Sequence, residues 1–136
     1  MGRGVARPIV REIELKIAMA DAVTRAVYKA PPSLLKEFKG DRLLPACRRL
    51  SFHVLRELEG DGWRPRGRRM GDGDARILEA IEMGMLKAGP AILRSLPYAQ
   101  ACDDKCDKEL LQGIGADLGE HALRAMRARS VEIEKR

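Results

Sequence analysis

Aromatic residues are scarce in this chain of 136 residues. They make up 4% of the sequence, and the five are Tyr28, Phe38, Phe52, Trp63 and Tyr98. A hydrophobic core must therefore come from Leu, Ile, Val, Met and Ala, which suits helices packed on helices better than a β-sandwich. Hydrophobic residues still reach 45% of the chain, which is typical of a globular protein and not of a disordered one.

Long apolar runs and a cysteine framework are also missing. No segment approaches the roughly 18 apolar residues of a transmembrane helix, and the N-terminus leads into charged residues, unlike a signal peptide. The three cysteines are an odd number without the spacing of a disulfide framework. We therefore expect a soluble, cytoplasmic protein that does not contact a membrane.

The sequence also has none of the short motifs of common enzyme classes. It has no glycine-rich loop ending in Lys-Ser/Thr, no His-Glu-x-x-His and no Gly-x-Ser-x-Gly. Without these motifs we expect no cofactor and no catalytic activity.

Apolar residues recur at helical spacing through most of the chain. A first helix is predicted from about residue 8 to 29, with an inner stripe of Ile13, Ile17, Ala20, Thr24 and Val27. A second set of apolar residues widens this stripe: Leu15, Met19, Val23 and Ala26.

Proline, glycine and capping residues divide the rest into further helices. Pro31-Pro32 ends the first helix, and Ser33, Asp41 and Asp74 are predicted to cap later ones. Gly89-Pro90 separates two helices, Pro97 is expected to end one, and the last helix is predicted to begin near Asp103. Three glycines at 113, 115 and 119 predict either a break in that helix or another backbone lying close to it.

These patterns predict an all-α protein. We expect residues 1–136 to form a single domain, a compact bundle of five to six helices with no sheet. Residues 60–73 contain five glycines and a proline, which predicts a flexible Gly/Arg-rich loop.

Charge is distributed unevenly along the chain, whose net charge is +6. Residues 1–71 have a net charge of +8, residues 72–122 of −5 and residues 123–136 of +3. Such polarity can steer a polyanion to one side of the molecule, or join the basic side of one subunit to the acidic side of another.

The strongest candidate site is the segment 63–69. It contains four arginines, no acidic residue and an aromatic residue at its edge: Arg64, Arg66, Arg68, Arg69 and Trp63. Arginine matches the geometry of phosphate, and a tryptophan can stack on an unpaired base. Arg48, Arg49 and Arg56 lie on the helix that leads to this loop and could extend the basic surface.

A pair of cysteines near the start of the last predicted helix also has a possible chemical role. Cys102 and Cys106 are four residues apart and could hold a metal with His53, His121 or Cys47. No second ligand cluster accompanies them, so we expect buried hydrophobic cysteines and no metal.

The segment from Arg48 to His53 has an arginine followed five residues later by a histidine. It resembles the Arg-x4-His motif of the HEPN ribonucleases, helical bundles that cleave RNA as dimers. The resemblance covers six residues near the middle of the chain, whereas that family has its motif towards the chain end. The family commonly has a different polar residue after the arginine, where this chain has Arg49. The resemblance implies a ribonuclease with catalytic Arg48 and His53, which remains an alternative to a non-enzymatic protein.

We therefore expect a small basic helical accessory subunit without enzymatic activity. It would bind the phosphate backbone of nucleic acid, with RNA or single-stranded DNA favoured, inside a larger assembly. The alternative is a protein–protein adaptor or self-associating scaffold, in which basic and acidic surfaces of neighbouring subunits meet.

Overall fold

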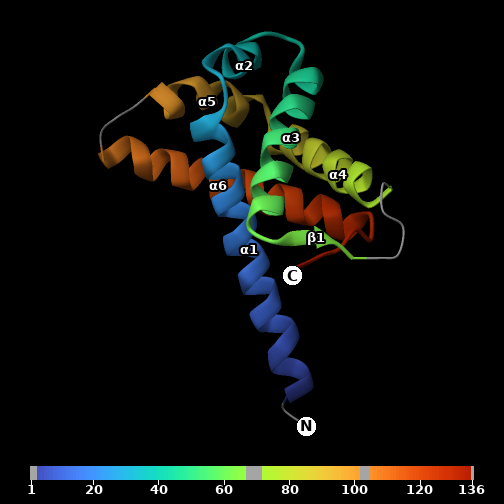
Figure 1. Ribbon diagram of the computed structural model, residues 1–136. Coiled ribbons are helices and arrows are strands. Elements are labelled where there is room, and N and C mark those ends of the chain that lie inside the picture. Colours follow the sequence, from blue (N-terminus) through green and yellow to red (C-terminus); the bar gives the residue numbers. More distant parts are fainter. Residues whose placement is uncertain (1–2, 67–71, 102–104, 136) are drawn as a thin grey trace.

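The computed structural model of the protein describes residues 3–66, 72–101 and 105–135, with the backbone alone for 3–10, 72–73 and 105–107. The elements follow in the order α1 (Arg3–Lys29), α2 (Pro32–Lys36), the 3-10 helix η1 (Glu37–Lys39), α3 (Leu43–Gly60), β1 (Trp63–Pro65), α4 (Asp72–Ala88), α5 (Pro90–Ala101), α6 (Lys105–Ala128) and β2 (Ile133–Lys135). The prediction of a compact all-α bundle is confirmed (Figure 1).

Helix α6 packs against both α1 and α4, and glycines make these contacts close. A Cβ atom at Gly115 would lie 3.1 Å from the carbonyl oxygen of Ala20, and one at Gly119 would lie 3.1 Å from the amide nitrogen of Ala20. On the other side, a Cβ at Gly84 of α4 would lie 2.6 Å from Cα of Ala122. Helix α6 is continuous, so the second of the two interpretations of its glycines is confirmed.

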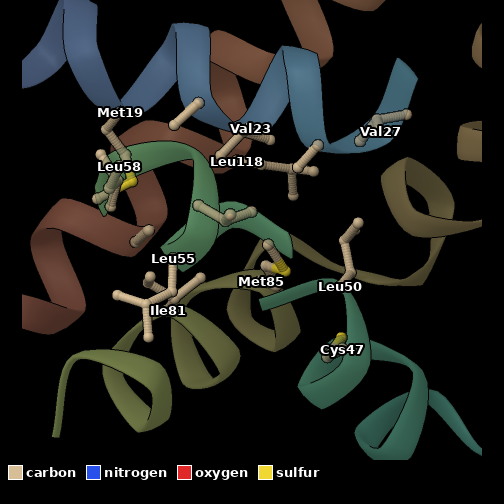
Figure 2. Close-up of a cluster of buried hydrophobic side chains, with 14 of the residues drawn as sticks. Met19, Val23, Val27, Cys47, Leu50, Leu55, Leu58, Ile81, Met85 and Leu118 are labelled. Carbon is tan, nitrogen blue, oxygen red and sulfur yellow. The ribbon is translucent and has the colours of Figure 1, made fainter. Parts of the chain in front are cut away.

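The core forms where α1, α3, α4 and α6 meet. Figure 2 shows side chains from these four helices converging, among them Met19, Leu58, Ile81 and Leu118. All four are almost fully buried. Burial of this kind contributes about 25 cal/mol for each Å² of apolar surface removed from water, and it fixes the position of α3.

The inner face of α1 differs from the predicted stripe. Ile13 and Ile17 are 52% and 58% exposed, whereas Met19, Val23 and Ala26 are buried. Figure 1 gives the reason, because α1 begins earlier than predicted and its N-terminal half extends past the other helices. The apolar stripe therefore continues along a part of α1 where Ile13 and Ile17 are only partly covered by the rest of the molecule.

Several predicted helix ends are confirmed and others are wrong. Helix α4 ends at Ala88 before Gly89, and α5 begins at Pro90, as expected. Pro97 does not end α5, which continues to Ala101. The cap residues of α2 and α3 are Pro31 and Arg42, so the predicted caps by Ser33 and Asp41 are wrong. The predicted cap by Asp74 is also wrong, because α4 already begins at Asp72.

The prediction that the protein has no strand is also wrong. Strands β1 and β2 pair antiparallel, with Trp63 opposite Lys135 and Pro65 opposite Ile133. This pairing fixes the first part of the predicted loop 60–73 against the C-terminal segment, while residues 67–71 lie outside the described part of the chain. None of the described helices combines the length and apolar composition needed to span a membrane.

Candidate nucleic-acid interface

Helix α3 has one buried face and one exposed face. Cys47, Leu50 and Val54 face the core and are buried. Arg49, Phe52, His53 and Arg56 follow one another at the spacing i, i+3, i+4, i+7. Because this spacing returns to the same side of a helix, these four side chains lie together on the side of α3 away from the core.

This side of α3 borders a hollow of about 370 Å³ beside α2, which we call the α2–α3 hollow. It is lined by Pro31, Ser33, Leu34, Glu37, Arg49, Phe52, His53 and Arg56. Phe52 is 50% exposed, although its phenyl ring has no polar atom to hydrogen-bond with water. The hollow therefore combines two arginines and a histidine with an accessible aromatic face.

The two arginines of the α2–α3 hollow have different surroundings. Nη1 of Arg49 donates to both carboxylate oxygens of Glu37, at 2.5 and 2.7 Å. Arg56 is exposed, and no carboxylate of the described residues pairs with it. Glu37 is the acidic residue of the lining, so the hollow keeps a net positive charge.

A second hollow of about 320 Å³ continues along α3 towards its N-terminus. It shares Glu37 and Arg49 with the α2–α3 hollow and adds Arg42 and Asp41. Arg49 and its partner Glu37 thus lie at the junction of the two hollows.

Arg48 lies on another side of α3. Its Nε atom donates to Oε2 of Glu82 at 3.1 Å, and its Nη2 atom donates to Oε1 at 3.3 Å. Glu82 belongs to α4 and is 5% exposed, so Arg48 balances a buried charge, and the pair raises the pKa of Arg48. Arg48 does not line the α2–α3 hollow, whereas His53 does. Of the two residues of the HEPN-like motif, His53 therefore lines the α2–α3 hollow, whereas Arg48 is paired with Glu82.

The arginines after α3 that the structure describes are held by the protein itself. Nη1 of Arg64 donates to the carbonyl oxygens of Glu59 and Trp63, both at 2.9 Å, which places its positive charge at the C-terminal end of α3. Nη1 of Arg66 pairs with Oε2 of Glu132 at 3.0 Å. The predicted contacts of Arg68 and Arg69 lie outside the described residues.

Trp63 does not have the exposure that its predicted stacking role requires. Its side chain is 6% exposed and belongs to the core, where β1 packs against α3. A base could reach it only if Trp63 left the core. The accessible aromatic residue next to the arginines is instead Phe52, and the spacing of Arg49, Phe52 and Arg56 in the sequence could have indicated it.

The cysteine and histidine side chains that the structure describes do not form a metal site. Cys47 is fully buried, and burial raises the pKa of its thiol to about 12. Nδ1 of His121 lies 2.9 Å from the carbonyl oxygen of Asp117, four residues earlier on α6. Among the described residues no three His, Cys, Asp or Glu side chains come close enough to hold a metal ion. The side chains of Cys102 and Cys106 lie outside this description.

Chemically, the α2–α3 hollow can hold an anion beside an aromatic ring. Guanidinium groups donate to phosphate or carboxylate oxygens, and a half-exposed phenyl ring offers a flat apolar surface.

Comparison with known proteins found no family model, no curated protein and no solved structure that matches this chain.

Proposed function

We propose that the protein is a non-enzymatic accessory subunit that binds the phosphate backbone of nucleic acid through the α2–α3 hollow. Arg49 and Arg56 contact phosphates, and Phe52 stacks on a base between them. Because a base must be unpaired to stack on a side chain, the preferred ligand is RNA or single-stranded DNA. The binding contributes to a larger nucleoprotein assembly.

The observation that supports this proposal best is the state of Arg56 and Phe52. An exposed arginine with no carboxylate partner in the described part of the chain lies one helical turn from a half-exposed aromatic ring. Arginine tracks the backbone of single-stranded nucleic acid, and aromatic rings stack on its bases. The combination fits this class of ligand better than either residue would alone.

To bind a phosphate, Arg49 must give up its ion pair with the carboxylate of Glu37. Its ion pair with Glu37 lies at the surface, with the two side chains 61% and 42% exposed. Exposed ion pairs contribute about 0–1 kcal/mol, so a phosphate can replace the carboxylate at low cost. Arg64, Arg68 and Arg69, which follow α3 in the sequence, would extend the contact.

The test is the affinity for a fluorescein-labelled oligouridylate, measured by fluorescence anisotropy. The double substitution Arg49→Ala/Arg56→Ala should weaken binding about tenfold or more, because it removes two charge-assisted contacts. Arg94→Ala/Arg124→Ala is the matched control, since these exposed arginines do not line the hollow and their loss changes the net charge equally. Equal affinities of the two double variants would reject the hollow as the binding site.

The adaptor alternative gives a different result in the same experiment. An adaptor binds neither oligouridylate nor oligodeoxythymidylate, and its oligomeric state changes between low and high salt because basic and acidic surfaces pair. The exposed Ile13 and Ile17 on the extended half of α1 are the observation that favours this alternative. A ribonuclease would instead shorten the oligouridylate during the measurement.

A further inference from the structure

We propose that a separate hollow binds a small organic anion with an apolar body. This hollow, of about 230 Å³, lies between α1, the C-terminal end of α6 and residues 131–133, and we call it the α1–α6 hollow. It shares no residue with the α2–α3 hollow, so the proposal is independent of nucleic-acid binding.

The floor of the α1–α6 hollow is apolar. It is formed by Leu15, Leu123, Met126, Val131 and Ile133, which come from α1, α6 and the C-terminal segment. Apolar atoms make up most of the wall, and five charged side chains surround them. This combination is typical of sites that bind small molecules, where the walls supply affinity and the polar groups supply orientation.

Arg11 is the polar group that points to an anion. Its Nη2 atom donates to the carbonyl oxygen of Ile133 at 3.1 Å, which holds the guanidinium at the rim. No carboxylate of the described residues pairs with Arg11, so the other N–H groups of the fork are available to a ligand. Leu15 lies one helical turn further along α1, so a ligand whose carboxylate binds Arg11 can place its apolar body over Leu15.

The other rim charges leave a positive excess. Arg66 pairs with Glu132 at 3.0 Å and Arg127 pairs with Glu12 at 3.4 Å. The two carboxylates are 63% and 60% exposed, and exposed pairs of this kind contribute little. With three arginines against two glutamates around one apolar floor, the hollow favours an anion over a neutral or cationic compound.

The test is a nuclear magnetic resonance titration of the isotopically labelled full chain with three compounds that share one apolar body. These are 4-phenylbutyrate, 4-phenylbutanol and 4-phenylbutylamine. The carboxylate should shift the methyl signals of Leu123, Met126 and Ile133 and bind about tenfold more tightly than the alcohol. The amine should bind most weakly.

The variant Arg11→Gln removes the positive charge of Arg11, while the glutamine side chain keeps an N–H group that can donate to the carbonyl oxygen of Ile133. It should lower the affinity for 4-phenylbutyrate about tenfold and leave that for 4-phenylbutanol unchanged. Arg124→Gln makes the same charge change on α6 outside the hollow and should have no effect. The proposal is overturned if the three compounds bind equally, if none shifts these methyl signals, or if both variants lose the same affinity.

Discussion

Glu37 occupies the place on Arg49 that a phosphate would take. Its two carboxylate oxygens both accept from Nη1 of Arg49, and the pair lies where the two hollows along α3 join. A nucleic acid that enters must replace this carboxylate and also pass close to its negative charge. Glu37 should therefore lower the affinity of the site.

The substitution Glu37→Gln should raise the affinity for oligouridylate about three- to tenfold, because it removes a competing and repelling charge. Glu120→Gln is the matched control. Glu120 also pairs with an exposed arginine, Arg124, and its side chain is 43% exposed against 42% for Glu37. Fluorescence anisotropy measures both, and an equal gain in the two variants would show a general charge effect and no competition at Arg49.

Replacing a glycine by alanine tests how closely α6 packs against its neighbours. Gly84→Ala should lower the free energy of unfolding by about 1–3 kcal/mol, because the new Cβ would lie 2.6 Å from Cα of Ala122. Gly113→Ala should instead raise it by up to about 1 kcal/mol, since no atom lies within 4 Å of the new Cβ and alanine favours helix. Urea unfolding followed by circular dichroism measures both values. Similar changes of the same sign would contradict the packing described for α4 and α6.

At the residue scale the sequence identified the arginines but not their partners. Arg49, Arg48 and Arg66 pair with glutamates that lie 12, 34 and 66 residues away in the chain. Such pairings depend on how helices and strands come together, which local spacing does not contain. For the same reason the sequence could not tell that Trp63 is buried. The exposure of Phe52 could have been inferred, because its helical spacing places it on the same side of α3 as Arg49 and Arg56.

At the scale of elements, one side chain of α5 holds the C-terminal end of α1. Nε2 of Gln100 donates to the carbonyl oxygens of Val27 and Ala30 at 3.0 and 2.5 Å. The last carbonyl groups of a helix have no partner within the helix, so Gln100 supplies one from another element. This contact also positions the turn that leads into α2 and the α2–α3 hollow.

Gln100→Ala should lower the free energy of unfolding by about 1 kcal/mol, because it leaves these carbonyl groups without their donor. Gln112→Ala, at an exposed position of α6, serves as the control and should change stability by less than about 0.5 kcal/mol. Urea unfolding provides the comparison. If the two variants were equally stable, Gln100 would not act as a cap of α1.

Helices were predictable where a long apolar period and a clear terminator coincide. Gly89-Pro90 between α4 and α5 is such a case. Strands β1 and β2 were not predictable, because each has three residues and their pairing joins segments about 70 residues apart. The prediction that Pro97 ends a helix was wrong, since α5 continues past this proline to Ala101.

At the scale of the whole molecule, the charge asymmetry of the sequence is partly cancelled by folding. Glu79 and Glu82 belong to the acidic middle of the chain, and they pair with Arg129 and Arg48 from its basic parts. The pair with Arg129 lowers the pKa of Glu79. Arg56 keeps a positive charge without a carboxylate partner among the described residues, and it lies beside the half-exposed Phe52, so we place a polyanion at the α2–α3 hollow.

The salt dependence of binding tests this claim most directly. Each phosphate contact on a single strand contributes about 0.7 to the slope of log affinity against log salt concentration. For oligouridylate, Arg49→Ala/Arg56→Ala should therefore reduce the slope by about 1.4, while Arg94→Ala/Arg124→Ala should leave it near that of the unmodified protein. A slope that stays the same when Arg49 and Arg56 are removed would contradict the account.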